Sequence, residues 1–84
     1  MNQVTVYTTE FCPYCQQAKR LLQQKGVPFT EVNLSEKPEE LAALKKRTGM
    51  RTVPQIFIKD ELIGGFTELL ALEQSKMLDE KLNA

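Results

Sequence analysis

The sequence predicts an α/β fold with the element order β-α-β-α-β-β-α and a four-stranded mixed sheet flanked by helices. Two observations predict it. Short runs of β-branched and aromatic residues alternate with segments in which apolar residues recur at helical spacing. The 84-residue length holds one domain, residues 1–84, and its 42% hydrophobic and 26% charged residues are typical of a folded soluble protein.

The first half of the chain alternates strand, helix and strand. Residues 4–7 are β-branched or aromatic and predict the first strand. Pro13 can open a helix without wasting an N–H group, and apolar residues at helical spacing extend this helix over residues 13–25. Residues 29–34 return to strand character. Two strands joined by a helix should be parallel, with a right-handed crossover.

The second half adds a helix, a hairpin and a helical tail. Ser35 is expected to cap a helix that has Pro38 in its first turn. Residues 55–58 and 62–63 flank a short polar turn and predict two antiparallel strands. From Phe66 onward, spaced apolar residues indicate one helix or two short ones packed on the sheet. Helices should then cover both sheet faces.

Charge and composition exclude several classes of function. Eleven basic and eleven acidic residues cancel, so no net field attracts nucleic acid or an anionic membrane. The sequence shows neither a secretory signal nor an apolar run long enough to cross a bilayer, which predicts a cytoplasmic protein. It also contains no histidine, which removes cysteine-protease pairs, serine triads and most metal hydrolases.

The chemistry of the chain is expected at the CPYC motif, residues 12–15. Cys12 falls where the first strand gives way to the first helix, so unpaired N–H groups and the helix dipole should lower its pKa below the value of about 8.5 for a free thiol. Cys15 lies three residues later, on the same side of the helix, and should be the more buried cysteine. This spacing predicts a reactive pair in which Cys12 acts first.

Three other interpretations of the two cysteines compete with a redox role. Zinc needs four ligands, so only a metal shared between two chains remains possible, and we expect no metal. A structural disulfide is disfavoured in a reducing compartment and would stabilise by only about 2 kcal/mol across so short a loop. The third interpretation is that both cysteines are buried and chemically inert. A CxxC at a helix start within a β-α-β pattern favours the redox role over all three.

Three segments together resemble the signature segments of glutaredoxins: CPYC at 12–15, RTVPQIFI at 51–58 and IGGFTEL at 63–69. Their order and spacing match along essentially the whole chain. The resemblance implies a thioredoxin-like fold and a glutathione-dependent thiol-disulfide oxidoreductase. It also implies that Cys12 is the nucleophile, that Cys15 is the resolving thiol, and that the two form a redox-active disulfide.

The same resemblance implies where glutathione binds. A cis peptide bond before Pro54 would turn the Val53 backbone toward the thiols, where an extended peptide can pair with it. Arg51 would neutralise the glycine carboxylate of glutathione, and the N–H groups that open the last helix suit the γ-glutamyl carboxylate. The full implied glutathione-binding set is Tyr14, Arg51, Thr52, Val53, Pro54, Gly65, Phe66, Thr67 and Glu68.

Two positions depart from the family pattern. Thr9 stands where glutaredoxins often carry Lys, and with Glu10 beside it the local field should favour a thiolate less. Glu68 stands where an Asp commonly meets the glutathione amine, which keeps the charge on a longer arm. We therefore expect weaker glutathione affinity than is usual in the family.

The sequence thus predicts a monomeric enzyme that reduces protein disulfides and glutathione mixed disulfides with glutathione as co-substrate. Its partners would be disulfide-containing or glutathionylated proteins, without nucleic acid or membrane. One rival hypothesis is a similar redoxin reduced by thioredoxin reductase, which Thr9 in place of Lys makes conceivable. Another is a module that binds an iron-sulfur cluster between two chains through Cys12 and glutathione thiolates, which Pro13 disfavours by family resemblance.

Overall fold

The computed structural model describes residues 1–84 and contains four strands and four helices. The elements are β1 (Val4–Thr8), α1 (Pro13–Gln24), β2 (Thr30–Asn33), α2 (Pro38–Thr48), β3 (Gln55–Ile58), β4 (Glu61–Gly64), α3 (Phe66–Gln74) and α4 (Leu78–Leu82). No helix combines the length and the apolar character needed to cross a membrane. The predicted element order is confirmed, and the helical tail consists of two helices.

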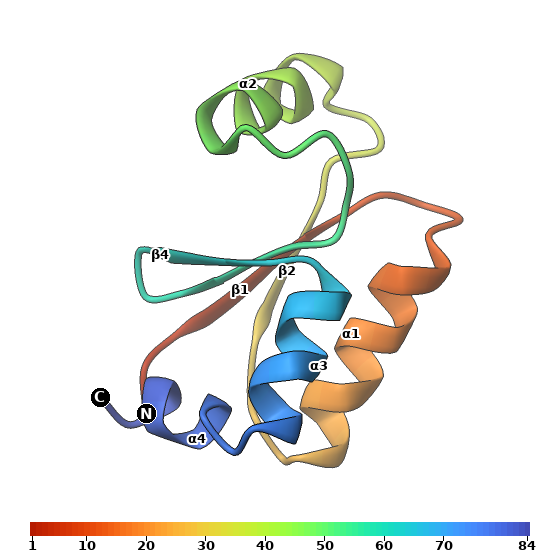
Figure 1. Ribbon diagram of the computed structural model, residues 1–84. Helices are drawn as coiled ribbons and strands as arrows, with labels where there is room; N and C mark the ends of the chain where they lie inside the picture. The colour runs from red at the N-terminus through yellow and green to blue at the C-terminus, as the bar shows by residue number, and fades with distance from the viewer.

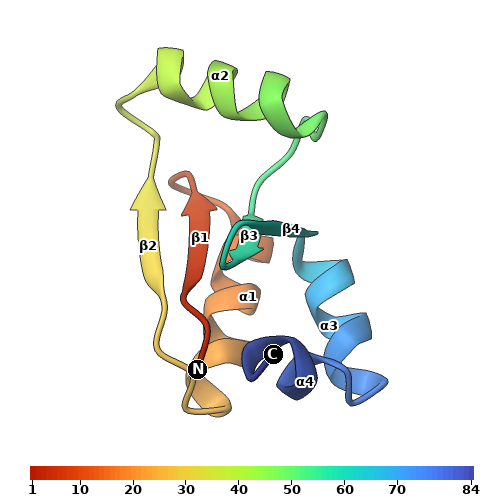
Figure 2. The ribbon, with the colours of Figure 1, turned by 90° about the vertical axis from the view of Figure 1, so that its left-hand side faces the viewer.

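The strands form one mixed sheet in the order β2-β1-β3-β4. Strand β1 pairs in parallel with β2 and antiparallel with β3, and β4 closes an antiparallel hairpin with β3. Figures 1 and 2 show α1 and α3 side by side along this sheet. The parallel first pair and the hairpin are both as the sequence predicts, whereas β2 is shorter than predicted at each end.

One face of the sheet carries the hydrophobic core. Alternate residues of β1 and β3 point to this face, and they pack against the apolar sides of α1, α3 and α4. The buried cluster consists of Val4, Val6, Ala18, Leu22, Val27, Ile56, Ile58, Leu69, Leu78 and Leu82. This packing fixes α1, and with it the CPYC motif, against the middle of the sheet.

The other face is much less covered, and α2 lies near only one end of it (Figure 2). Helix α2 lies beyond the C-terminal ends of β1 and β2 (Figure 2), and Leu44 is its one buried residue. On this face Tyr7 and Phe57 make an edge-to-face pair, and the guanidinium of Arg47 lies 5.6 Å from the centre of the Phe57 ring. The prediction that helices cover both faces is therefore met only in part, because α2 reaches the second face at one end of the strands (Figure 2).

The predicted cap of the second helix is wrong. Helix α2 begins at Pro38 with Lys37 at the N-cap position, and no side chain caps it. A separate turn comes first, in which the Lys37 N–H donates to the Leu34 carbonyl. The Ser35 hydroxyl instead accepts a hydrogen bond of 2.6 Å from the Glu10 N–H, in the loop that leads to the cysteines.

The packing of α1 on the sheet predicts how substitutions in this helix change the free energy of unfolding. Leu22 has no exposed surface, so Leu22→Ala should lower the free energy of unfolding by about 2–5 kcal/mol through lost burial and a residual cavity. The neighbouring Gln23 is exposed, and Gln23→Ala should stay within about 0.5 kcal/mol of the parent. Urea unfolding of the oxidised protein measures both. Equal losses for the two variants would contradict this placement of α1.

Candidate active site

The CPYC motif lies at the start of α1, as the sequence predicts. Cys12 is the N-cap residue with extended backbone, and Pro13 is the first residue of the helix. Cys12 is half-buried, whereas Cys15 is 1% exposed. The two form a disulfide, with their Cα atoms 5.2 Å apart. The predicted pairing and the predicted difference in burial are both confirmed.

The surroundings of the Cys12 sulfur favour negative charge on it. The Cys15 N–H donates to Cys12 Sγ at 3.1 Å, so the sulfur fills the role of a capping side chain. This N–H belongs to the first turn of α1, where the helix dipole is positive. On reduction, the same donor and the same dipole will stabilise a Cys12 thiolate. The Val53 carbonyl oxygen, 3.6 Å from Cys12 Sγ, acts in the opposite direction, because it can accept a hydrogen bond from the thiol but not from the thiolate.

The loop before β3 faces the cysteines and contains the cis peptide bond between Val53 and Pro54. This confirms the cis bond that the family resemblance implies. Gln55, with no exposed surface, braces the loop because its Nε2 donates to the carbonyls of Met50 at 3.2 Å and Thr52 at 3.1 Å. Sequence reasoning gave Gln55 no such role. A polar residue at the start of a buried strand is the signal that points to it.

A cleft of about 400 Å³ lies beside the motif and collects most of the predicted glutathione-binding residues. Its lining is Tyr14, Met50, Thr52, Val53, Pro54, Gly65, Phe66, Thr67 and Glu68. Eight of the nine predicted residues are therefore together. Arg51 is exposed and does not line the cleft. Met50 lines it but was not predicted, because nothing in the sequence distinguishes its apolar side chain from a core residue.

The far wall of the cleft is the junction of β4 and α3. Glu68 folds back over the helix start, where its Oε1 accepts a 2.7 Å hydrogen bond from the Gly65 N–H. Gly64 has φ of 127°, and a Cβ there would lie 2.7 Å from Glu68 Cγ. The glycine therefore leaves room for this fold-back. The Tyr14 ring stacks on Phe66 with centroids 6.4 Å apart, which joins α1 to this wall.

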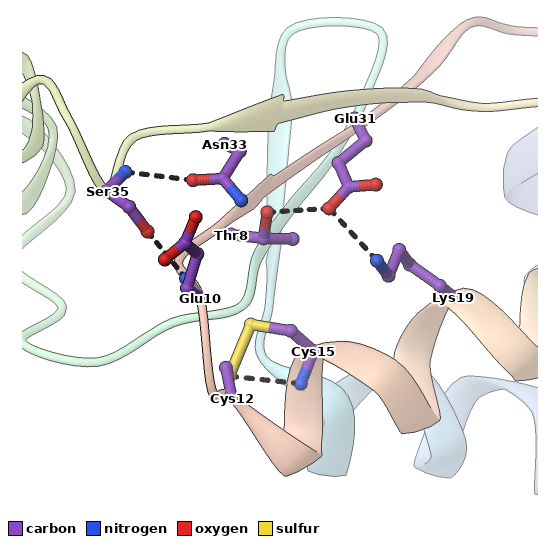
Figure 3. A network of polar contacts seen from close by, with 8 residues as sticks. All are labelled: Thr8, Glu10, Cys12, Cys15, Lys19, Glu31, Asn33 and Ser35. Atoms are coloured by element: carbon purple, nitrogen blue, oxygen red, sulfur yellow. Dashed lines mark hydrogen bonds and ion pairs between the residues drawn. A yellow bond between two sulfur atoms is a disulfide. The ribbon is translucent and has the colours of Figure 1, made fainter.

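A hydrogen-bonded cluster of Thr8, Glu31 and Lys19 links β1, β2 and α1 close to the disulfide (Figure 3). Glu31 Oε2 accepts hydrogen bonds from the buried Thr8 hydroxyl at 2.8 Å and from Lys19 Nζ at 3.0 Å. Burial raises the pKa of the Glu31 carboxyl, but the hydrogen bonds from Lys19 and Thr8 and the charge of Lys19 outweigh it, and the pKa is lowered. Glu31 therefore remains ionised across the neutral range and ties β2 to the helix that carries both cysteines.

The lowered pKa of Glu31 predicts a pH-dependent contribution to stability. A carboxyl whose pKa is lower in the folded state stabilises fully above its unfolded value of 4.5, and this stabilisation disappears as the pH falls through the folded value. Glu31→Gln should therefore reduce the free energy of unfolding at pH 7, with a difference from wild type that shrinks below pH about 4.5. Denaturant unfolding at several pH values measures this difference. Glu36→Gln, at an exposed position outside the helices and without an ion pair, should stay within about 0.5 kcal/mol of wild type throughout, whereas a pH-independent deficit in Glu31→Gln would contradict the prediction.

A cysteine pair at a helix start, next to a cis-proline loop on a four-stranded mixed sheet, places the chain among the thiol-disulfide oxidoreductases of thioredoxin-like fold. Comparison with known proteins narrows this class. The sequence model of the glutaredoxin family matches residues 4–63. The chain belongs to the glutaredoxin family and is an enzyme of glutathione-dependent thiol-disulfide exchange.

Relatives agree over the whole chain. A glutaredoxin of Pseudomonas aeruginosa is 49% identical over 84 residues, covering all of both chains. Glutaredoxin 3 of Escherichia coli is 45% identical, over 98% of this chain and 99% of that one. Among solved structures, a buckwheat glutaredoxin-glutathione complex superposes with a TM-score of 0.91 at 30% identity, over 98% of this chain and 77% of that one. The solution structure of a glutaredoxin from Brucella melitensis superposes with a TM-score of 0.87 at 43% identity, over 100% of this chain and 94% of that one.

Proposed function

We propose that Cys12 is the attacking thiolate, that Cys15 is the resolving thiol, and that glutathione lies in the cleft beside them. The observation that carries this assignment is the unequal setting of the two sulfurs. Cys12 is half-buried and its sulfur receives an N–H hydrogen bond at a helix start, whereas Cys15 is 1% exposed behind it. A disulfide in solution can therefore reach Cys12 first.

The two cysteines would divide the reaction as follows. The Cys12 thiolate attacks one sulfur of a substrate disulfide, the S–S bond breaks, and the other sulfur leaves as a thiolate that takes a proton from water. With a protein disulfide, Cys15 then attacks Cys12, releases the bound thiol and forms the Cys12–Cys15 disulfide, which two glutathione molecules reduce. With a glutathionylated substrate, Cys12 carries glutathione, and a second glutathione thiolate removes it as oxidised glutathione.

The placement of glutathione follows the family resemblance and the walls of the cleft. Its sulfur would lie beside Tyr14, its backbone along Val53, and its γ-glutamyl carboxylate at the start of α3, where Phe66 and Thr67 supply N–H groups. Glu68 would meet the glutathione amine through Oε2, since Oε1 already accepts from the Gly65 N–H. A buckwheat glutaredoxin of the same fold has been solved as a complex with glutathione, which supports glutathione as the ligand of such a cleft.

The cellular setting that we propose is a cytoplasmic monomer reduced mainly by glutathione, acting on disulfide-containing or glutathionylated proteins. Balanced charge and the family of its relatives support this setting. Turnover coupled to glutathione and glutathione reductase should exceed turnover coupled to thioredoxin reductase. The reverse order would favour the redoxin alternative.

Two cysteine variants test the division of roles. On the mixed disulfide of glutathione and free cysteine, Cys12→Ser should lower turnover to the uncatalysed rate, whereas Cys15→Ser should keep roughly half of it or more, because this route needs one thiol. On a protein disulfide, both variants should lose turnover. NADPH consumption coupled to glutathione reductase measures each rate. Activity retained by Cys12→Ser would overturn the assignment.

Arg51 gives a separate test of the glutathione site. If its guanidinium meets the glycine carboxylate, Arg51→Ala should raise the KM for glutathione by up to about fivefold with little change in kcat, since an exposed ion pair contributes little more. Arg20, exposed on α1, provides the matched control, and Arg20→Ala should leave KM unchanged. An unchanged KM in Arg51→Ala would remove Arg51 from the site and would agree with its absence from the cleft lining.

A further inference from the structure

Phe11, the residue before the CPYC motif, holds an aromatic side chain in solvent. It is 98% exposed, whereas the other three phenylalanines are partly buried. Phe29 and Phe66 pack against the core, and Phe57 packs on the second face of the sheet. Phe11 therefore adds nothing to the packing of the fold. Single exposed apolar residues are common on proteins, but Phe11 directly precedes the reactive cysteine pair.

The backbone at Phe11 is held in an unusual conformation. Its φ is 56°, in the left-handed region that bulky side chains seldom adopt. Both neighbours are fixed, because the Glu10 N–H donates to Ser35 Oγ at 2.6 Å and the Cys12 carbonyl accepts from the Gln16 N–H at 3.1 Å. The bend between β1 and α1 therefore presents the Phe11 ring to solvent in a defined place. Such conformations, held by their surroundings, cluster at functional sites.

Phe11 also lies outside the glutathione cleft. Tyr14, three residues later, lines the cleft, but Phe11 does not. Glutathione in the cleft would therefore leave the Phe11 ring uncovered. During exchange, the Cys12 thiolate bonds to the glutathione sulfur while the bond from that sulfur to the substrate cysteine breaks. The residues that flank the substrate cysteine must then approach the rim around Cys12, where Phe11 is the large apolar side chain outside the cleft.

We propose that Phe11 is a recognition residue for protein substrates, contacting an apolar side chain next to the disulfide-bonded cysteine of the substrate. An aromatic ring fixed in position can bury apolar area with little loss of side-chain freedom. Glutathione and other small disulfides do not touch it. Phe11 thus selects among glutathionylated proteins by the residues around their modified cysteine. This inference rests on the proposed placement of glutathione in the cleft.

The test compares three substrates that share the same reacting bond. They are the mixed disulfide of glutathione with free cysteine and two glutathionylated pentapeptides, Ser-Leu-Cys-Leu-Ser and Ser-Ser-Cys-Ser-Ser. Phe11→Ser should lower kcat/KM for the leucine peptide about tenfold, a typical effect of truncating a recognition residue. Turnover of the other two substrates should stay within about twofold. Phe11→Leu should restore most of the loss.

Two controls separate recognition from folding and from thiol reactivity. Phe11→Gly accepts the positive φ without strain, so it should fold at least as stably as the parent and still lose the preference for the leucine peptide. Met77→Ser, at another exposed apolar position, should change nothing. The thiolate absorbance of reduced Cys12 should titrate at the same pH in Phe11→Ser and wild type.

Each result decides the question. An equal fall on all three substrates, or a shifted Cys12 titration, would mean that Phe11 acts on the nucleophile and would overturn the proposal, as would unchanged kinetics on the leucine peptide. Failure of the wild-type protein on the small mixed disulfide would instead contradict the proposed function itself.

Discussion

The site depends on one junction, where β1 ends at Thr8 and α1 begins at Pro13. Three hydrogen bonds define it: the Leu34 N–H to the Thr8 carbonyl at 2.9 Å, the Glu10 N–H to Ser35 Oγ at 2.6 Å, and the Gln16 N–H to the Cys12 carbonyl at 3.1 Å. Two of the three come from the segment after β2. The parallel pairing of β1 with β2 therefore holds the loop that aligns the Cys12 sulfur with the axis of α1. Without this alignment the helix dipole would not act on the sulfur.

The cleft beside the cysteines is formed by segments that lie far apart in the sequence. Its walls come from the first turn of α1, the loop before β3 and the start of α3, which are brought together by the packing of α1 and α3 on one face of the sheet. The Tyr14–Phe66 stack joins the first turn of α1 to the start of α3, and Gln55 holds the loop before β3 in shape. A buried residue such as Leu69 thus contributes to binding indirectly, because it fixes the helix that supplies one wall.

Local patterns in the sequence were enough to predict the elements, because period and helix-starting prolines are properties of neighbouring residues. They were also enough for the pairing of Cys12 with Cys15 and for the greater burial of Cys15, since a spacing of three at a helix start fixes both. They were not enough for Ser35. Its hydroxyl could accept from the first N–H groups of α2 or from the loop before α1, and in the structure it accepts from the Glu10 N–H of that loop. The lining by Met50 and the outward ring of Phe11 likewise depend on where the chain bends in space.

Thr9 stands where glutaredoxins often carry Lys, and Glu10 lies beside it. Judged by charge alone, these two residues should make the Cys12 thiolate less stable. The structure moderates this expectation. The Ser35 bond fixes the Glu10 backbone, and Figure 3 shows the Glu10 carboxylate on the Ser35 side of the loop, directed away from the disulfide. The Cys15 N–H stands 3.1 Å from the Cys12 sulfur and remains in place on reduction as part of α1. A close, oriented donor outweighs a more distant exposed charge, because water screens the latter far more strongly. In the mechanism that we propose, backbone geometry at the helix start, rather than a neighbouring cation, is therefore the main stabilising influence on the Cys12 thiolate.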